Sequence, residues 1–358
     1  MISIWYEVLA NYLWRFHNSS ITFDFPEKYQ RNRAFQSIQS SDDFRSAEQK
    51  YMAAPTYNSE STLDRYKEYI NSNISYSNSS NEIAVLTGGN RGMGFEIARE
   101  LAKKQYHLII GCRNVTNGEE AKEKLIKESG NTNIEILELD VSSIDSINRF
   151  GNILLSRREK IIRLMNNAGA MTHTFRTTSD GFENTLETNY IGPLLLTLKL
   201  LPLMPPESRI VNMDSVTYMW TWLDKTMLID GGSSEYSQLP VYYRSKLALM
   251  FATLRLSEDL QKRKIYVAAA DPGVVLTGIV NLNPIATFFV KRLGRFVMLP
   301  PTVGASPAIK LLTDDQPLNG DLMGVSGLKH VSDYYRYNVV KNCIYNQTID
   351  HLFDQIFM

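Results

Sequence analysis

Short apolar runs alternate with longer segments of helical period along this chain from residue 82 onward. The runs lie at 83–86, 108–110, 134–137, 161–165, 209–213 and 266–270. Short buried runs separated by helices predict a doubly wound parallel sheet of the α/β class. Right-handed crossovers would then place the loops that follow the strands along one edge of the sheet, where ligands bind.

The chain before and after this pattern has a different amino-acid composition. Residues 17–81 are rich in Ser, Asn, Tyr and charged side chains, and 71–80 has the composition of a loop. We therefore expect residues 1–81 to be a partly flexible N-terminal extension, with a short helix over 63–70. The sheet domain would span 82–332, and 333–358 would form a C-terminal tail.

Composition excludes several classes of protein. Of 358 residues, 38 are Lys or Arg and 38 are Asp or Glu, so there is no basic excess to indicate a nucleic-acid partner. Cys112 and Cys343 are far apart and the five histidines lack ligand spacing, which argues against a disulfide framework and a metal site. The apolar start is interrupted at Glu7 and follows no basic segment, so we expect a chain on the cytoplasmic side that is not secreted.

A glycine-rich turn follows the first predicted strand and precedes a helix-like run. Glycines let the backbone turn tightly and approach a pyrophosphate, which then lies at the positive end of the helix. Such a turn is weak evidence alone, but its place in a strand–turn–helix unit strengthens it. The candidate cofactor-binding residues of the turn are Thr87, Gly88, Asn90, Arg91, Gly92, Met93 and Gly94.

The second predicted strand ends at 111–114 without a carboxylate that could accept hydrogen bonds from ribose hydroxyls. Arg113 and Arg91 could instead bind a 2′-phosphate through charge-assisted hydrogen bonds. The alternative is that both are solvated surface side chains. Their joint position favours NADP(H) over NAD(H).

Tyr242 and Lys246 are four residues apart on a predicted helix and therefore share one of its faces. An ammonium beneath a phenol would lower the tyrosine pKa from its usual value near ~10, and a positively charged oxidised nicotinamide would add to this effect. Tyr242 could then exchange a proton with a carbonyl or an alcohol. The alternative is an amphipathic contact with no chemistry, and Tyr243, three residues from Lys246, is the neighbour that could be mistaken for the acid.

The motifs T-G-x-x-x-G-x-G, D-V, N-N-A-G, Ser, Y-x-x-x-K and P-G occur in this order across about residues 82–332. This order resembles the short-chain dehydrogenase/reductase superfamily, which implies a Rossmann-type fold and a nicotinamide cofactor. The resemblance extends the cofactor-binding set to Asp140, Val141, Asn167, Ala168, Gly169, Tyr242, Lys246, Pro272, Gly273, Val275 and Thr277.

The same resemblance assigns two more catalytic roles. Ser215 would hydrogen-bond the substrate oxygen, and Asn189 would hold a helix distortion and a water that relays protons to Lys246. A serine at a strand end is otherwise a common turn or cap residue. Asp214 departs from the family, which commonly has serine there, and strand alternation should turn it away from the Ser215 face. Asp271 stands where many relatives have histidine or asparagine.

Residues 180–183, 242–249 and 271–275 look most like the retinol-dehydrogenase-like branch, including its X-linked dehydrogenases/reductases that act on polyprenols. This resemblance implies an oxidoreductase of lipid metabolism that transfers a hydride between NADP(H) and a lipophilic alcohol, aldehyde or ketone. An alternative of a different class is an inactive NADP(H)-binding scaffold that uses residues 1–81 for interactions.

Residues 285–299 lie where relatives carry the substrate lid. Ile285, Phe289, Leu293 and Phe296 approximate one helical face, and three basic residues lie among them. A basic amphipathic helix fits peripheral contact with an anionic membrane or lipid-droplet surface. A lid helix packed on its own domain is the alternative.

Overall fold

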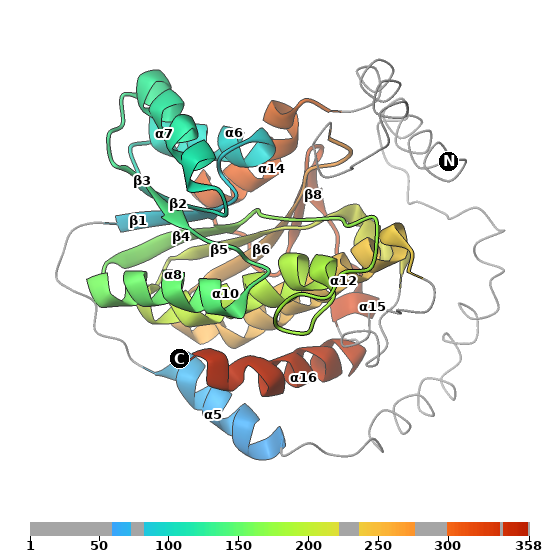
Figure 1. The fold of residues 1–358 in the computed structure, drawn as a ribbon. Helices are drawn as coiled ribbons and strands as arrows, with labels where there is room; N and C mark the ends of the chain where they lie inside the picture. The colour runs from blue at the N-terminus through green and yellow to red at the C-terminus, as the bar shows by residue number, and fades with distance from the viewer. Residues whose placement is uncertain (1–58, 73–81, 222–235, 276–298, 337–338, 357–358) are drawn as a thin grey trace. The chain divides into compact units, whose positions relative to one another are not determined.

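The six predicted strands all form, and they lie in one sheet. The computed structural model describes residues 59–72, 82–221, 236–275, 299–336 and 339–356. Within these ranges the sheet has eight strands in the order β3-β2-β1-β4-β5-β6-β7-β8, parallel except for the last pair (Figure 1). The strands are β1 (Glu82–Thr87), β2 (His107–Cys112), β3 (Ile134–Glu138), β4 (Lys160–Asn166), β5 (Arg209–Met213), β6 (Tyr266–Asp271), β7 (Leu322–Gly324) and β8 (Gly327–Lys329). The sequence pattern missed β7 and β8, because each is only three residues long.

Helices cover both faces of the sheet, as expected for a doubly wound fold. One face carries α6 (Gly92–Lys103), α7 (Val115–Ser129) and α14 (Pro301–Thr313), and the other carries α8 (Ile144–Arg157), α10 (Gly192–Leu200) and α12 (Gln238–Asp259). Successive side chains of β1 alternate between two buried clusters, with Ile83 and Val85 in one and Ala84 and Leu86 in the other. Both faces of the sheet are therefore core, which explains the continuous apolar runs.

Short helical elements complete the chain between these helices. They are α9 (Asn184–Leu186), η1 (Glu187–Ile191), η2 (Leu201–Leu203), η3 (Val216–Trp220), η5 (Gln261–Arg263) and α15 (Asp333–Arg336). The strand order reverses between β1 and β4, so the loops that follow these two strands diverge and leave a crevice site of the kind that binds ligands in such sheets.

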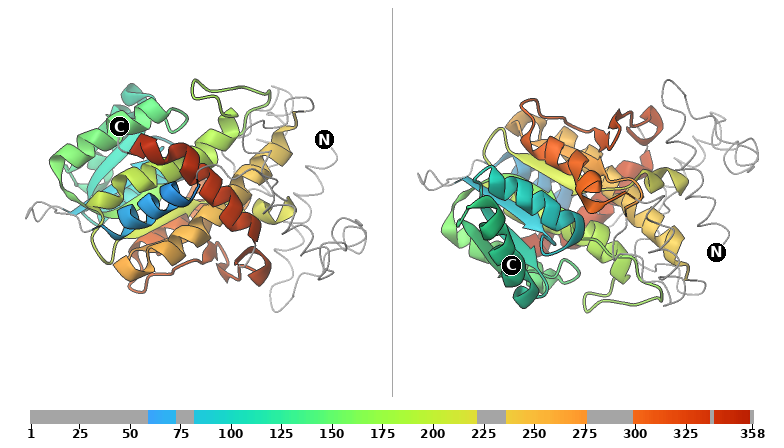
Figure 2. Two further views of the ribbon diagram at one scale, coloured as in Figure 1. Left: turned by 90° about the horizontal axis from the view of Figure 1, so that it is seen from below. Right: turned by 90° about the horizontal axis from the view of Figure 1, so that it is seen from above.

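Two helices form an additional layer over α10 and α12. The predicted helix over 63–70 forms as α5 (Ser59–Asn71), and the C-terminal tail forms α16 (Val339–Ile356). Seen from below, α5 and α16 lie side by side across the sheet-covering helices (Figure 2). Tyr66 of α5 and Tyr345 of α16 are almost fully buried in the main core cluster.

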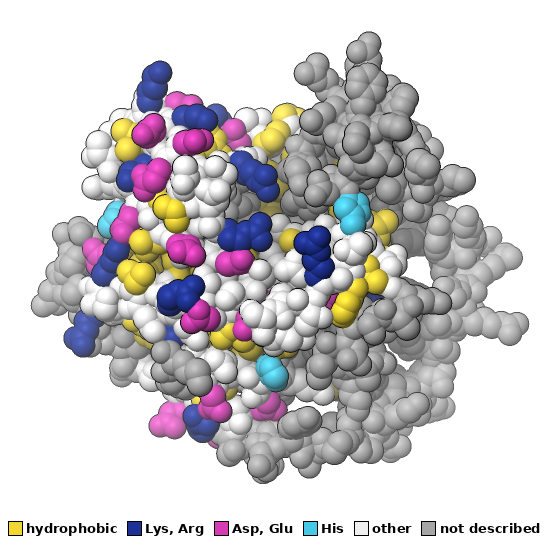
Figure 3. All heavy atoms as spheres, viewed as in Figure 1, with side chains coloured by type: hydrophobic (Ala, Val, Ile, Leu, Met, Phe, Trp, Pro, Cys, Tyr) yellow, Lys and Arg dark blue, Asp and Glu magenta, His cyan; other side chains and the backbone are white. Residues whose placement is uncertain are grey.

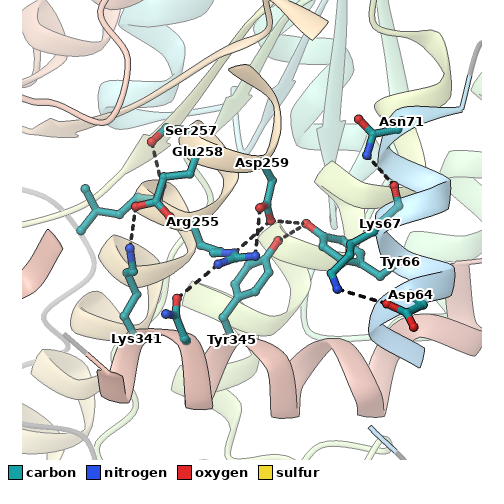
Figure 4. Close-up of polar contacts among 12 residues, drawn as sticks. Asp64, Tyr66, Lys67, Asn71, Arg255, Ser257, Glu258, Asp259, Lys341 and Tyr345 are labelled. Atoms are coloured by element: carbon teal, nitrogen blue, oxygen red, sulfur yellow. Dashed lines mark hydrogen bonds and ion pairs between the residues drawn. The ribbon is translucent and has the colours of Figure 1, made fainter. Parts of the chain in front are cut away.

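Polar contacts hold this layer to α12 (Figure 4). The hydroxyl of Tyr66 donates to Asp259 at 2.9 Å and lies 2.7 Å from the hydroxyl of Tyr345. Lys341 of α16 pairs with Glu258 at 2.6 Å. Parts of the chain that are almost 280 positions apart thus meet at the end of one helix.

The surface agrees with the balanced charge of the chain. On the face shown in Figure 3, basic and acidic side chains are intermixed. Among the described helices, none has the length and hydropathy needed to cross a bilayer. Most of segment 285–299, which carries the predicted membrane contact, falls outside the described residues.

Candidate active site

The loops that follow β1 and β4 are joined by hydrogen bonds at the edge of the sheet. The hydroxyl of Thr87 accepts bonds from the backbone N–H groups of Asn167 and Ala168, both at 3.0 Å. The Asn167 amide donates in return to the carbonyls of Thr87 and Gly88 at 3.0 Å. The N-N-A-G turn is therefore hydrogen-bonded directly to the start of the glycine-rich loop.

Glycine is required in this loop for geometric reasons. A Cβ on Gly94 would lie 2.1 Å from the carbonyl oxygen of Gly88, so only glycine lets α6 pack against the loop. Gly92 has φ +58° with open space where a Cβ would project. Arg91, the N-cap of α6, makes no side-chain capping bond. The loop and the uncapped helix start together fit the phosphates of a dinucleotide.

The remaining residues of the turn differ in exposure. Met93 is buried in the core, whereas Asn90 is half-buried and Arg91 is exposed. Met93 therefore offers a ligand its backbone, while its side chain packs beneath the loop.

The adenosine end of the predicted site contains Arg113 and Asp140. The Arg113 guanidinium lies 3.9 Å from the Asp140 carboxylate and is largely exposed. Asp140 also accepts hydrogen bonds from the backbone N–H and hydroxyl of Ser142, at 3.0 and 2.6 Å. The following residue, Val141, is buried, and its carbonyl approaches Gly192 so closely that a Cβ there would lie 1.9 Å away.

The loop after β6 forms the opposite end of the site. Gly273 follows Pro272 in a tight turn and has φ +68°. Its N–H donates to Asp271 at 3.1 Å. Val275 forms an isolated bridge with Leu299. Thr277, the last predicted cofactor-binding residue, lies outside the described residues.

Helix α12 brings Tyr242 and Lys246 together. The Lys246 ammonium lies 5.6 Å from the centroid of the Tyr242 ring and donates to the Met213 carbonyl at 2.7 Å. Lys246 is only 4% exposed, whereas Tyr242 and Ser215 keep some exposure to solvent. The shared helix face predicted from the spacing of four is confirmed. Tyr243 instead packs edge-on against Trp220, with ring centroids 5.5 Å apart.

Ser215 lies at the start of η3, beside Tyr242. Its hydroxyl accepts hydrogen bonds from the Thr217 hydroxyl at 3.0 Å and from the Thr217 N–H at 3.3 Å. A hydrogen bond with Ser215 also lowers the pKa of Tyr242, but burial and the charges of Asp214 and Asp271 raise that pKa well above its ordinary value. The expected lowering of the Tyr242 pKa is therefore wrong for this structure, because burial outweighs the opposing effects.

Asn189 lies in η1, which is a π-helical turn between α9 and α10. Its amide group donates to the Ala170 carbonyl at 2.9 Å and to the Ser245 hydroxyl at 3.0 Å, and its oxygen accepts from the Ala170 N–H at 2.8 Å. The predicted helix distortion is present. It lets Asn189 connect the loop after β4 to α12, one residue from Lys246.

The electrostatic surroundings of Lys246 include two carboxylates that the sequence identified as departures. Asp214 and Asp271 are each 1% exposed. Asp271 forms an ion pair with Lys329 of β8. No local pattern could have identified Lys329, because it reaches Asp271 only through the pairing of β6, β7 and β8.

The family follows from this arrangement together with sequence similarity. A model of the short chain dehydrogenase family matches residues 82–284. The chain belongs to that family. Its members use a nicotinamide cofactor and act as oxidoreductases, and the fold and the retinol-dehydrogenase-like resemblance expected from the sequence are confirmed.

Several curated relatives resemble this dehydrogenase over most of its length. Mouse (Mus musculus) retinol dehydrogenase 12 is 31% identical over 76% of this chain and 84% of its own. Polyprenol dehydrogenase of Danio rerio is 34% identical over 72% and 78%. A chloroplastic short-chain dehydrogenase of Brassica napus, TIC 32 B, is 32% identical over 70% and 79%.

A solved structure shows the same fold. The crystal structure of an uncharacterised protein from Mycobacterium paratuberculosis superposes with a TM-score of 0.60 at 25% identity. It covers 78% of this chain and 95% of its own.

Proposed function

We propose that this short-chain dehydrogenase is an NADP(H)-dependent oxidoreductase that acts on a lipophilic alcohol, aldehyde or ketone. The observation that supports the proposal is a chain of contacts: Lys246 lies 5.6 Å from the Tyr242 ring centroid, Ser215 hydrogen-bonds Tyr242, and Asn189 bonds Ser245, the neighbour of Lys246. When bound, the nicotinamide supplies or accepts the hydride, and the side chains of this chain handle the proton and the oxygen.

Each of the four residues would have a distinct task. Ser215 hydrogen-bonds the substrate oxygen and shares it with Tyr242, which offsets the charge that develops during transfer. Tyr242 gives its proton to a carbonyl during reduction or takes one from an alcohol during oxidation. Lys246 holds its positive charge beneath Tyr242 and contacts the nicotinamide ribose. Asn189 keeps the π-helical turn and orders a water that exchanges protons with Lys246.

The decisive test replaces Tyr242 by phenylalanine. Removing one oxygen should leave folding and NADP(H) binding nearly intact and reduce turnover by about 10²–10⁴-fold, the range of general acid/base contributions. Nicotinamide absorbance would measure turnover against retinoid, polyprenol, steroid and small carbonyl panels. Tyr243→Phe is the matched control, because its ring contact with Trp220 survives the change.

The turnover of Tyr242→Phe and Tyr243→Phe, together with NADP(H) binding, distinguishes an active enzyme from an inactive scaffold. Activity that survives Tyr242→Phe but not Tyr243→Phe would mean that the catalytic register is wrong by one residue. Tight NADP(H) binding with no turnover on any panel would instead favour the inactive scaffold.

Cofactor choice rests on two arginines. Arg91 and Arg113 are exposed beside the loops that follow β1 and β2, where a ribose 2′-phosphate would lie. NADPH should bind more tightly than NADH, and Arg113→Ala should remove most of the difference. Arg149→Ala, an exposed change on α8, is the control. Equal binding of the two cofactors to the unmodified protein would refute the preference.

Peripheral membrane binding through residues 285–299 remains part of the proposal on the basis of sequence. Charge reversal at Lys291, Arg292 and Arg295 should release the protein from anionic liposomes in co-sedimentation. Unchanged sedimentation would favour the lid-helix alternative.

A further inference from the structure

Two buried carboxylates lie beside the catalytic lysine. Asp271 is the last residue of β6, and Asp214 directly follows the neighbouring strand β5, where its N–H donates to the Ala270 carbonyl at 2.8 Å. Adjacent parallel strands end at the same edge of a sheet, so both residues lie at the edge that carries Ser215.

The two carboxylates differ in their partners. Asp271 has an ion pair with Lys329 and accepts a hydrogen bond from the Gly273 N–H. Asp214 accepts a bond from the Ser215 N–H at 2.8 Å through one oxygen only. Its other oxygen, Oδ2, is buried and has no hydrogen-bond partner within the described part of the chain. An unpaired buried oxygen is costly, so its retention calls for a role.

The charged and titratable groups that face Asp214 come from several elements. Lys246 and Tyr242 are on α12, Asp271 is on β6, and Tyr218 is on η3. Lys329 of β8 compensates the charge of Asp271, which leaves Lys246 as the cation that Asp214 influences directly. Behind Tyr218 lie Tyr335 and Arg336 of α15.

Position reinforces this electrostatic link. The Lys246 ammonium is bound to the carbonyl of Met213, the residue immediately before Asp214. Asp214 therefore lies between Met213, whose carbonyl binds the ammonium, and Ser215, which would bind the substrate oxygen. A change in charge at residue 214 therefore changes the pKa of both Lys246 and Tyr242.

We propose that Asp214 is a positioning residue that acts through Lys246, holding the ammonium beneath Tyr242 and keeping Tyr242 protonated until it donates to the carbonyl. This inference rests on the proposed function. Burial raises the pKa of Asp214 to about 7, and the Lys246 charge and the Ser215 N–H oppose that rise. As Asp214 loses its proton, its negative charge raises the pKa of both Lys246 and Tyr242. A tyrosine that holds its proton more tightly remains a donor to higher pH.

The first test measures kcat/KM for carbonyl reduction against pH in the full chain. Asp214→Asn and Asp214→Ser both remove the charge. The alkaline limb of the profile should move to lower pH by roughly one unit in both variants, because Tyr242 then loses its proton earlier. Asp354→Asn, a largely exposed change on α16, should leave the profile in place.

The second test needs neither cofactor nor substrate. Unfolded aspartate titrates near ~3.9, whereas burial raises the pKa of folded Asp214 to about 7. The folded state therefore binds this proton more tightly, and stability falls as pH rises from about 4 through about 7. The Tm of Asp214→Asn, relative to the unmodified protein, should increase between pH 5 and pH 8. A merely structural role would shift Tm equally at every pH.

Each outcome decides something. An unmoved alkaline limb in a folded variant, or a Tm difference that is flat across pH, overturns the role of Asp214 even if Tyr242→Phe abolishes turnover and the proposed function stands. Full activity in Tyr242→Phe overturns the proposed function, and the role of Asp214 falls with it.

Discussion

Helix α12 buries polar side chains at both ends, but the two ends satisfy them differently. Toward its C-terminus, Arg255 pairs with both oxygens of Asp259 at 3.1 Å, and Tyr66 donates to the same carboxylate. Toward its N-terminus, Lys246 lies beside Asp214, one of whose oxygens has no hydrogen-bond partner in the described chain.

The difference in hydrogen bonding indicates that the C-terminal end of α12 serves folding stability and the Lys246 end serves the reaction. A fully paired buried network stabilises a fold and fixes its packing, because no group loses water without a replacement. A buried carboxylate oxygen that lacks a hydrogen-bond partner destabilises the fold, but it leaves the protonation of the group free to change. We therefore expect substitutions at the Tyr66 end of α12 to affect folding, and substitutions at the Lys246 end to affect turnover.

Among the substitutions that compare the two ends of α12, Lys246→Ala should have the largest effect. It removes the cation beneath Tyr242 and leaves Asp214 without its main opposing charge, so turnover should fall by at least ~100-fold. NADP(H) binding should weaken as well, and the free energy of unfolding should fall, because the buried Asp214 then lacks the positive charge of Lys246. Steady-state kinetics, cofactor titration and urea unfolding would measure the three effects. Lys262→Ala, an exposed lysine of η5, is the control, and near-normal turnover in Lys246→Ala would contradict the comparison.

Tyr66→Phe should have the opposite profile. It removes a buried hydroxyl that bonds Asp259 and Tyr345, which should cost about 1–3 kcal/mol of unfolding free energy. Turnover per folded molecule should not change. Denaturant unfolding with a parallel activity assay tests both statements. Tyr106→Phe is the matched control, since its half-buried ring lies outside this network. A loss of kcat larger than the loss of folded protein would mean that the two ends of α12 are coupled.

Arg65→Ala should have the smallest effect. Its guanidinium pairs with Asp354 at 3.3 Å and lies 5.0 Å from the Phe353 ring centroid, but both charged side chains are more than half exposed. Exposed pairs contribute little, so unfolding free energy should change by less than ~1 kcal/mol. Added salt should reduce the difference further. A loss as large as that of Tyr66→Phe would show that α5 is held mainly at its surface and not by its buried tyrosine.

Local patterns were enough for much of the site. The glycine turn between Thr87 and Gly94 and the spacing of Tyr242 and Lys246 are short-range features, so their geometry follows from the turn and from the helical repeat. The apolar runs predicted the six longer strands for the same reason. The spacing of Ile344, Tyr345, Ile349, Leu352 and Phe353 also has helical period, and it is the signal from which α16 could have been predicted.

Partner choice among buried polar groups depended on the folded chain. Lys329 meets Asp271 only because β8 pairs with β7 at the edge of the sheet, and Tyr66 meets Tyr345 only because α5 and α16 lie together on α12. Strand alternation gave an expected direction for the Asp214 side chain, but it did not indicate that Lys246 and Tyr242 would lie within electrostatic reach of that carboxylate. The helical and strand periods in the sequence predict which face of an element a side chain lies on. What it meets there is decided by contacts between distant parts of the chain, whose energies are absent from any local pattern.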